Sequence, residues 1–492
     1  MSVLEMLTEI RSYAGAAKTT GLKDAVVSQF ADRDPSLRRA ITEAVQRHRS
    51  MRADYADLLA MDEAVLTKRV QEDFLNFYPA NCINPYVSLA AAGPWIVTAH
   101  GAVLHDSGGY GMLGFGHGPT QIIKAMSDNW VMANVMSPSL SQKRLGDFLR
   151  KEIGHSRGSC PYESFICLNS GSESVTVAAR ISDINAKVRT DPGGEDEGKR
   201  VNLLALKGGF HGRTDRPAQA SDSTLPKYRA NLYSHHVREK LITVEPNNTE
   251  SLEAAFSKAN EDGVFIEAVF IEPVMGEGNP GQAISRSFYD TARSLTKAHG
   301  SLLLVDSIQA GIRATGCLSI VDYPGFEDAE APDMETYSKA LNAGQYPLSV
   351  LALNERAANM YVSGVYGNTM TTNPRALEVA CAVLGSITQD IRSNIVARGT
   401  EFVEKLEMLS TEFPGAIVSV RGTGLLLAAE LNETLPVIGF GKIEEYCRNN
   451  GVGVIHGGKN ALRFTPHFAI TSEEVDAIID VLRMALQHFW AE

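Results

Sequence analysis

Asp306 and Lys339 are the two residues whose types and positions suggest chemistry most directly. Asp306 closes the apolar run 302–305, which predicts a buried strand. Lys339 follows a second short segment, 334–338. A lysine amine can form a Schiff base, and a carboxylate can keep a ring nitrogen protonated, so the pair would suit pyridoxal phosphate. Asp306 could equally cap a helix or form an ion pair, and Lys339 could be an ordinary surface lysine.

A phosphate group would find a site where a predicted strand, 165–168, meets a predicted helix, 174–188. The connection contains Ser170, Gly171 and Ser172. The first turn of a helix has free backbone N–H groups and the positive end of the helix dipole, which together attract anions. The two serine hydroxyls would add donors. The alternative is an ordinary turn in which a serine caps the helix.

Three other turns contain residues that could line the same site. In 209–214, which follows the predicted strand 203–206, Phe210 could stack on a flat ring or could simply be buried in a tight turn. Segment 271–278 places carboxylates at a strand end, where they could face the site or the solvent. Further along, Thr369 could donate a hydrogen bond to phosphate, although most threonines in loops have no such role.

The glycines of 109–114 match G-x-G-x-x-G, the pattern of a dinucleotide-binding turn. In that motif the glycines end a strand and open a helix, whereas here residues 115–119 continue as a loop. A glycine-rich turn in the wall of an active site is therefore favoured over a nicotinamide site.

Arg463 lies in an apolar, strand-like segment, 462–464. A buried arginine needs an anionic partner. A substrate carboxylate bound through both of its oxygens would serve, and so would a structural carboxylate. The sequence also contains histidines that could bind a metal, namely His117, His211, His456 and His467. Their spacing along the chain does not match a metal site, so the sequence predicts no metal.

Strand and helix patterns alternate between about residues 120 and 375, which predicts a mainly parallel sheet wrapped by helices. Ligands bind at the carboxyl ends of the strands in such sheets, where Asp306 is expected. The remaining chain predicts helices at the start and a smaller α+β domain at the end. The expected division is a helical extension, 1–75, the first part of the small domain, 76–118, a large cofactor-binding domain, 119–375, and the rest of the small domain, 376–492.

The composition places this chain of 492 residues among globular proteins with two or three domains. A net charge of −12 argues against general nucleic-acid binding. The six cysteines are scattered without a C-x-x-C pair, which favours a reducing, cytoplasmic environment and no cysteine zinc site. The first residues lack the apolar core of a signal peptide. No apolar run reaches the roughly 18 residues of a membrane span.

Taken together, the motifs resemble those of the class III aminotransferases, which are fold type I pyridoxal phosphate enzymes and include ornithine, acetylornithine, 4-aminobutyrate and lysine 6-aminotransferases. The resemblance runs from about residue 80 to 492 and keeps the family's motif order. It rests on GHGP, NSGSES, FHGRT, IEPVMGEG, DSIQAGIRATG, SKAL, GNT followed by NP, VRGTGL and LRFTPHF. It implies an α/β fold with a large, mainly parallel, seven-stranded type of sheet and a smaller α+β domain.

The resemblance also implies roles for individual residues. Lys339 would form the internal aldimine with pyridoxal 5'-phosphate and later move the proton between the substrate carbon and the cofactor. Asp306 would keep the ring nitrogen protonated. The remaining cofactor contacts would come from Gln309 near the phenolic oxygen, from Ser170, Gly171 and Ser172 at the phosphate, and from Phe210 on the ring with His211 beside it.

Three residues would act on the substrate or across subunits. Thr369 would reach the phosphate in the neighbouring subunit, which implies a homodimer with shared active sites. Arg463 matches the arginine that binds the α-carboxylate of glutamate or 2-oxoglutarate, and Glu277 matches a glutamate that pairs with that arginine in several members. The expected reaction moves an amino group from a primary amine or ω-amino acid to an oxo acid such as 2-oxoglutarate.

The chain departs from the family pattern at two places near the expected cofactor. Ser307 stands where the family commonly has glutamate, and 174–176 is Ser-Val-Thr where Ala-Asn-Glu is common. These changes leave open a related enzyme with another outcome, namely a decarboxylase, an epimerase or an aminomutase. A second alternative is a binding protein on a retired enzyme fold, against which the intact Asp306 and Lys339 argue.

Overall fold

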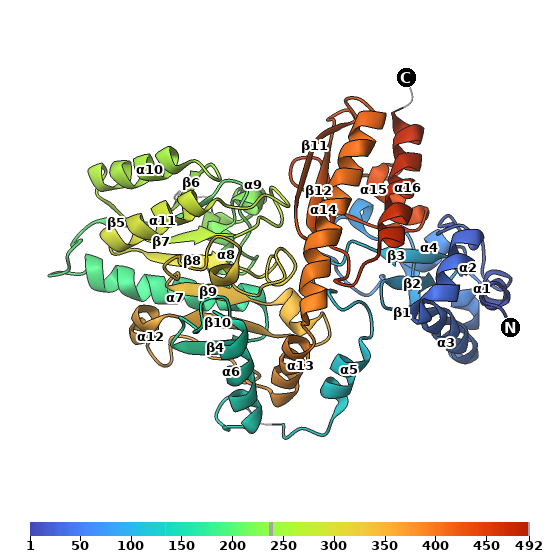
Figure 1. The fold of residues 1–492 in the computed structure, drawn as a ribbon, viewed down its shortest axis with the longest axis horizontal. Coiled ribbons are helices and arrows are strands. Elements are labelled where there is room, and N and C mark those ends of the chain that lie inside the picture. The colour runs from blue at the N-terminus through green and yellow to red at the C-terminus, as the bar shows by residue number, and fades with distance from the viewer. Residues whose placement is uncertain (133, 236–239, 491–492) are drawn as a thin grey trace. The chain divides into compact units, whose positions relative to one another are not determined.

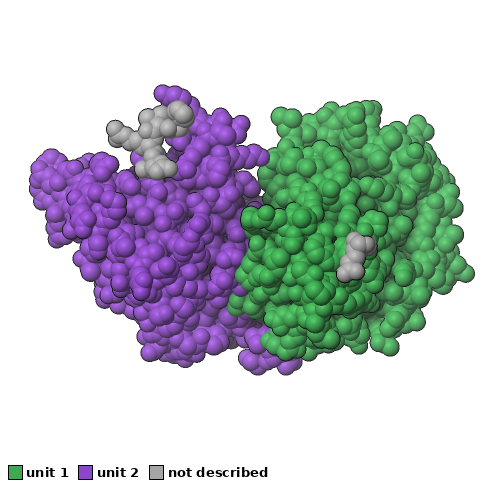
Figure 2. All heavy atoms as spheres, turned by 90° about the horizontal axis from the view of Figure 1, so that it is seen from above, with its two compact units in different colours: residues 1–120, 397–492 green, residues 121–396 purple. Residues whose placement is uncertain are grey.

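The computed structural model describes residues 1–132, 134–235 and 240–490. The chain divides into two compact units, one formed by Met1–Thr120 with Ala397–Glu492 and the other by Gln121–Val396 (Figure 2). The sequence predicts that the large domain ends near residue 375, whereas this unit continues to Val396. The reason is that α13 (Pro374–Gly385) packs against α6 (Leu140–Glu152), and Arg392 pairs with Glu152 at 2.7 Å.

The unit 121–396 is built on a seven-stranded sheet with the order β4-β10-β9-β8-β7-β5-β6 (Figure 1). Six of these strands run in the same direction, and β10 is antiparallel to both of its neighbours, so the predicted mainly parallel sheet is confirmed. The strands are β4 (Ser164–Leu168), β5 (Arg200–Leu206), β6 (Leu241–Val244), β7 (Val264–Ile271), β8 (Leu302–Asp306), β9 (Met334–Tyr337) and β10 (Ser349–Leu353).

The central strands β7 and β8 are buried along their whole length, because helices cover both faces of the sheet. Helix α7 (Gly171–Thr190) lies across the sheet and packs Val175 and Ala178 against Leu304. The other helices of this unit are α8 (Asp215–Ala220), α9 (Leu225–Asn231), α10 (Thr249–Glu261), α11 (Arg286–Ala298) and α12 (Glu355–Met360), with short 3-10 turns at Asp222–Thr224, Tyr233–His235, Ile320–Asp322 and Lys339–Asn342.

The long helix that the sequence predicts over 375–413 is two helices, α13 and α14 (Gln389–Glu412). They are interrupted at 386–388. The hydroxyl of Thr388 accepts a hydrogen bond from the backbone nitrogen of Ile391 at 3.3 Å, so it caps the second helix where it begins.

The unit formed by 1–120 and 397–492 contains two four-stranded sheets. One has the order β1-β2-β3-β13 and the other β11-β12-β15-β14. The apolar runs 95–97 and 102–104 on either side of His100 and Gly101 predict a hairpin, which is confirmed as β2 and β3. The strands are β1 (Ser88–Ala92), β2 (Trp95–Thr98), β3 (Val103–Asp106), β11 (Ile417–Thr423), β12 (Leu426–Leu431), β13 (Val452–Gly453), β14 (Ile455–Gly457) and β15 (Ala461–Phe464). The helices near the C-terminus are α15 (Ile443–Asn449) and α16 (Ser472–Phe489), and α5 (Thr120–Ser127) begins at the end of the first segment.

The N-terminal extension is helical, as the sequence predicts, and it covers the first small sheet. It comprises α1 (Val3–Arg11), α2 (Asp24–Arg33), α3 (Pro35–Leu59) and α4 (Glu63–Arg69), followed by a 3-10 turn at Ala80–Cys82. Helix α3 packs on β1 and β2 and buries Leu37, Ile41 and Ala44. It is therefore part of the core of this unit. Among the described residues, no helix has the length and apolarity needed to cross a membrane.

Candidate active site

Asp306 and Lys339 line one cavity of about 190 Å³ in the unit 121–396. Strands β8 and β9 are parallel neighbours, and their register places Asp306 beside Thr336. Lys339 follows Thr336 by one short turn, so both residues stand at the carboxyl edge of the sheet. The other residues around the cavity are Ser170, Gly171, Ser172, Phe210, His211, Gly212, Glu272, Ile308, Gln309 and Ser338.

The N-terminus of α7 opens into this cavity. The hydroxyl of Ser170 caps the helix by accepting a hydrogen bond from the nitrogen of Glu173 at 3.2 Å. Gly212 lies close by with φ +119°, and a Cβ on it would approach the hydroxyl oxygen of Ser172 to 2.3 Å. This position therefore requires glycine. The free N–H groups at the start of a helix of this length form a site suited to phosphate.

Asp306 is buried and its carboxylate is held in a fixed orientation. Its Oδ2 lies 2.9 Å from Nδ1 of His211, and its Oδ1 accepts a hydrogen bond from the nitrogen of Ile308 at 3.1 Å. The nitrogen of His211 in turn donates to the hydroxyl of Ser221 at 2.9 Å. Two independent contacts thus hold a carboxylate at the cavity, as a partner for a positively charged ring nitrogen requires.

Glu272 is a further buried acid in the cavity, and the sequence left its orientation open. Its two carboxylate oxygens accept hydrogen bonds from the nitrogens of Phe210 at 3.0 Å and Gly276 at 2.9 Å. Burial raises the pKa of Glu272 to about 7, and Asp306 raises it further while His211 lowers it. Glu272 therefore holds the turn that carries Phe210. The apolar run 268–271 directly before Glu272 was the available sign that this carboxylate is buried.

Gln309 and His211 each present a polar atom that lacks a partner. Gln309 is 6% exposed, and its Nε2 makes no hydrogen bond to the residues that the structure describes. The same is true of Nε2 of His211. A Cβ on Gly276 would lie 1.9 Å from Oε1 of Gln309, so the close packing here depends on glycine. A ligand with polar groups on its ring would satisfy such buried atoms.

Lys339 adopts φ +43°, in the left-handed region that residues with a side chain rarely enter. Such a conformation costs on the order of 1–3 kcal/mol and persists where the surrounding structure imposes it. Here Ser338 is anchored by a hydrogen bond from its hydroxyl to the carbonyl of Leu348 at 2.7 Å. The strain follows from placing Lys339 at the cavity directly after β9.

The first departure from the family pattern, Ser307, has a partner in this chain. Its hydroxyl donates to Glu335, a carboxylate of β9 that is fully buried. Glu335 also accepts hydrogen bonds from the hydroxyls of Ser319 and Tyr162, at 2.5 Å and 2.6 Å. Burial raises the pKa of Glu335, and these donors oppose that effect. The chain therefore has a buried carboxylate beside position 307, but it comes from Glu335 on β9.

The second departure from the family pattern, 174–176, lies inside α7, and its side chains contact other parts of this unit. Ser174 contacts the hydroxyl of Thr336 on β9 and donates to the carbonyl of Gly171. Val175 is wholly buried in the core. The hydroxyl of Thr176 donates to the carbonyl of Ser172 at 2.7 Å. None of the three is among the residues that line the cavity.

Three predicted residues are not among those that line this cavity. Thr369 is exposed, in the segment before α13. Glu277 is half-buried, just beyond the turn at Gly276. Arg463 belongs to the other unit, where it is buried in β15 with the centre of its guanidinium 5.6 Å from the centroid of the Tyr110 ring.

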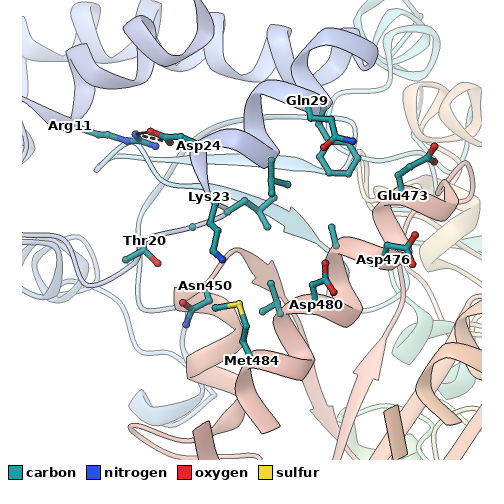
Figure 3. Close-up of a pocket in the computed structure, with 16 residues that line it drawn as sticks. Arg11, Thr20, Lys23, Asp24, Gln29, Asn450, Glu473, Asp476, Asp480 and Met484 are labelled. Atoms are coloured by element: carbon teal, nitrogen blue, oxygen red, sulfur yellow. Dashed lines mark hydrogen bonds and ion pairs between the residues drawn. The ribbon is translucent and has the colours of Figure 1, made fainter. Parts of the chain in front are cut away.

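A separate cavity of about 490 Å³ lies in the unit 1–120 with 397–492, between α2 and α16 (Figure 3). Its wall carries Asp476 and Asp480 from α16 and Asp24 from α2. Each of these acids has an ion-pair partner, namely Lys405 at 2.5 Å, Arg483 at 2.6 Å and Arg11 at 2.9 Å. Among the residues that line this cavity, no lysine and aspartate stand at the ends of adjacent strands as Lys339 and Asp306 do.

Comparison with known proteins decides what the first cavity belongs to. The model of the family described as aminotransferase class-III matches residues 79–486. The chain belongs to the class-III aminotransferase family. The predicted family, fold class and activity are thereby confirmed: this class-III enzyme is a pyridoxal phosphate-dependent aminotransferase.

Individual relatives of this class-III enzyme are similar over most of their length. An acetylornithine aminotransferase of Xanthomonas axonopodis pv. citri is 28% identical over 391 residues, which cover 78% of this chain and 89% of that protein. The ornithine aminotransferase 2 of Staphylococcus aureus strain MRSA252 is 28% identical over 409 residues, covering 82% and 94%.

Solved structures show the same fold as this class-III enzyme. The ornithine aminotransferase of Toxoplasma gondii ME49 has a TM-score of 0.72 at 20% identity and covers 89% of this chain and 98% of its own. An S-selective transaminase of Bacillus megaterium has a TM-score of 0.71 at 17% identity, covering 86% and 97%. Another structure of the Toxoplasma enzyme is described as having partial occupancy of pyridoxal phosphate at the active site.

The cavity residues of this class-III enzyme fit the cofactor. The N-terminus of α7 suits its phosphate. The buried Nε2 of Gln309 needs an acceptor, such as an oxygen on the ring. The buried carboxylate of Asp306 would suit a protonated ring nitrogen, and the amine of Lys339 could form a Schiff base.

Proposed function

We propose that Lys339 is the lysine that carries pyridoxal phosphate, and that the enzyme moves an amino group from a primary amine or ω-amino acid to an oxo acid such as 2-oxoglutarate. One observation carries this proposal: Lys339, Asp306 and the N-terminus of α7 border a single cavity. The unit 121–396 would then be the cofactor-binding domain.

The proposal assigns each part of the cofactor to residues of the cavity. Ser170, Gly171 and Ser172 would hold the phosphate through hydroxyl groups and backbone N–H groups. Phe210 would cover the ring, and its turn is fixed because its nitrogen donates to Glu272 at 3.0 Å. Asp306 would contact the ring nitrogen, with His211 beside it. Gln309 would contact the phenolic oxygen, and Lys339 would bond to the carbonyl carbon.

When bound, pyridoxal phosphate supplies an electron sink that stabilises negative charge on the substrate carbon. Asp306 sustains this property because it holds the proton on the ring nitrogen. The Nζ of Lys339 would act as general base, taking the proton from the carbon that bears the amine, and then as general acid, delivering that proton to the cofactor and not back to the same carbon. The strained backbone of Lys339 fixes where this amine stands.

The names of the relatives support an ω-amino donor, since they are aminotransferases of ornithine and acetylornithine. Arg463 is proposed to bind the carboxylate of the oxo acid through a bidentate pair of hydrogen bonds. Its guanidinium is buried, and burying a charge of this kind requires an anion close to it. Glu277 is proposed to pair with Arg463 when the amino donor is bound.

We further propose a homodimer with shared active sites, in which Thr369 reaches the phosphate bound to the partner. Thr369 is exposed, as this role requires. The segment between α5 and α6 also exposes apolar side chains that association would cover, namely Val131, Met132, Val135, Met136 and Leu140. The six cysteines are free among the described residues, which supports the reducing cytoplasm as the proposed location.

The central assignment can be tested by trapping the cofactor on its lysine. The holoenzyme is reduced with borohydride, digested and analysed by mass spectrometry. The pyridoxyl adduct is expected on the peptide that contains Lys339, and the Lys339→Ala variant should carry none. Lys207→Ala is the matched control, because Lys207 also follows a strand of this sheet but is exposed and paired with Glu245. An adduct on another lysine would refute the assignment.

The amino donor can be identified with the same holoenzyme. Its absorbance is followed while amines and ω-amino acids are added one at a time without any oxo acid. Complete conversion to the amine form of the cofactor by one donor class establishes transamination and names that class. Consumption of a donor without this conversion would instead indicate a decarboxylase, an epimerase or an aminomutase.

A further inference from the structure

Three metal-ligating side chains meet in the unit 1–120 with 397–492, away from the cavity of Asp306. They are His105 at the end of β3, His467 in the loop after β15 and Glu474 in the first turn of α16. One ligand atom from each residue lies within 4.8 Å of the other two. Spacing along the chain does not reveal this cluster, because its members come from three separate elements.

The distances around Glu474 match those of a tetrahedral metal site. Its Oε1 lies 3.4 Å from Nε2 of His105 and 3.2 Å from Nε2 of His467. Zinc binds histidine nitrogen and carboxylate oxygen at about 2.0–2.2 Å, so two ligands at a tetrahedral angle stand roughly 3.3–3.5 Å apart. Two of the three distances between ligand atoms therefore already have the length that a tetrahedral site requires.

His105 presents a nitrogen that has no other partner. The residue is 1% exposed, and its Nε2 makes no hydrogen bond to the residues that the structure describes. A buried imidazole nitrogen that faces Oε1 of Glu474 at 3.4 Å without a hydrogen bond is poorly satisfied, and a metal ion between the two would bond to both. This observation is independent of the clustering, and it distinguishes the site from an ordinary group of polar side chains.

The surrounding residues orient the ligands as outer partners do in metal sites. Nδ1 of His105 lies 2.9 Å from the hydroxyl of the buried Ser107, which can accept its proton and leave Nε2 free for a metal. The backbone nitrogen of Thr471 donates to Oε2 of Glu474 at 2.7 Å, so Oε1 is the oxygen that faces both imidazoles. The Trp95 ring packs edge-on against His105 with 5.3 Å between ring centroids.

A cavity of about 550 Å³ connects the cluster with the exterior of this unit. His467 and Glu474 are among the residues that line it, together with Phe30, Arg33 and Phe115. Such a cavity gives an ion a route of entry and leaves room for a water molecule as a fourth ligand. Three protein ligands with one open position is a known arrangement for zinc.

We propose that His105, His467 and Glu474 bind one divalent transition-metal ion of the zinc type. Two imidazoles and one carboxylate suit zinc and its neighbours, whereas magnesium and calcium prefer sites made of oxygen alone. The ion would join β3 to the start of α16 and keep one coordination position for a water molecule. The chain after β3 is also linked to the chain after β15, which carries His467, by the hydrogen bond from the nitrogen of Thr465 to the carbonyl of Ser107 at 2.7 Å.

The test uses the full-length holoenzyme, purified without a metal-affinity tag and dialysed against a chelator. Cobalt(II) is added, because a tetrahedral site gives it intense absorbance at longer wavelengths than the cofactor. One equivalent of cobalt is expected to bind and to be displaced by zinc. His467→Ala and Glu474→Gln should each weaken binding by more than the roughly 10- to 100-fold that loss of an outer partner costs.

His456→Ala is the matched control for these variants. His456 is also a partly buried histidine beside a carboxylate, with its Nδ1 3.1 Å from Oε1 of Glu444. The structure brings no second histidine to that pair among its described metal-ligating groups. Cobalt affinity should therefore stay unchanged in this variant. Near-ultraviolet circular dichroism and cofactor absorbance verify that every variant is folded.

A measurement on the unmodified enzyme guards against variants that fail to fold. Trp95 lies beside His105, so bound cobalt should quench its fluorescence in step with the absorbance change. Saturation of both signals at one equivalent supports the site. If cobalt gives no tetrahedral spectrum, or if His467→Ala binds it as tightly as the unmodified chain, the proposal is wrong and the three side chains form a hydrogen-bonded cluster only.

Discussion

The hydroxyl of Ser307 donates a hydrogen bond to the buried carboxylate of Glu335, with 2.6 Å between the two oxygens. Ser307 directly follows Asp306, and Glu335 stands on the neighbouring strand, four residues before Lys339. The contact therefore joins the two strands whose ends carry the proposed catalytic pair. It also gives a physical reason for serine at this position, because a second carboxylate here would face Glu335.

Ser307→Ala is expected to lower the free energy of unfolding by about 1–3 kcal/mol, because the buried carboxylate of Glu335 loses a donor. Denaturant unfolding measures this change, with Ser127→Ala as a control at an exposed helix end. Ser307→Glu should destabilise the protein more than Ser307→Ala, since two buried carboxylates would then repel each other. Equal stability of Ser307→Ala and the unmodified chain would show that the contact contributes nothing.

Gly212→Ala should weaken binding of pyridoxal phosphate. The new Cβ would approach the hydroxyl oxygen of Ser172 to 2.3 Å and disturb the start of α7. Gly193→Ala is the matched control, because Gly193 also has a positive φ, +87°, but a Cβ there meets nothing within 4 Å. Cofactor dissociation constants from absorbance titration compare the two. If both variants bind the cofactor equally well, the Gly212 contact does not shape the phosphate site.

Asp306→Asn should reduce kcat by about two to three orders of magnitude, the range seen when one preorganised electrostatic group is lost. The amide keeps the shape of the carboxylate but cannot hold a proton on the ring nitrogen. The Lys339 adduct should still form after borohydride reduction, since that reaction needs only the lysine. Steady-state kinetics with the identified donor measures the loss, and a change of less than tenfold would contradict the role of Asp306.

Glu267 should make the protein less stable as pH rises from about 4.5 to about 7. Burial raises the pKa of this carboxyl from 4.5 to about 7, although Arg216 opposes the shift. Within this window the unfolded chain releases a proton that the folded chain keeps, so the free energy of unfolding falls as pH rises. The expected loss is on the order of 2 kcal/mol.

Glu267→Gln should remove this part of the pH dependence while keeping an oxygen for Arg216, whose Nη2 lies 2.6 Å from Oε1 of Glu267. Denaturant unfolding between pH 4.5 and 8 compares the variant with the unmodified chain. The difference in the free energy of unfolding between the two proteins should change between pH 4.5 and about pH 7 and stay constant at higher pH. Parallel profiles across the whole range would show that Glu267 titrates at its ordinary pKa.

Arg463→Ala is expected to raise KM for the oxo acid by roughly 10- to 100-fold, which is the worth of one charged hydrogen-bonded contact. Cofactor affinity should not change. Arg421→Ala is the control, because Arg421 lies in the same sheet and pairs with Glu430 at 2.7 Å. Steady-state kinetics with the oxo acid varied gives both constants, and an unchanged KM for Arg463→Ala would remove this residue from the substrate site.

The fold was predictable because the sequence carries strong local signals. Uninterrupted apolar runs occupy 302–305 of β8, 268–271 of β7 and 203–206 of β5, so a parallel sheet buried on both faces followed directly. Helix α16 carries a strong local signal as well, since Thr471 and Glu474 form a capping box before an amphipathic run. The break at 386–388 was missed although Gly385 ends α13 and Thr388 caps α14, because the apolar spacing continues across it.

The sequence by itself was enough to propose which residues carry the cofactor chemistry. Asp306 ends a buried strand, Lys339 follows the next one, and parallel strands bring their carboxyl ends to one edge. Contacts between side chains of separate elements were decided only by the tertiary structure. Glu335 receives Ser307, and His105 meets His467 and Glu474, because strands and helices distant along the chain pack together. Local patterns define elements, but only packing in three dimensions determines which of their side chains face one another.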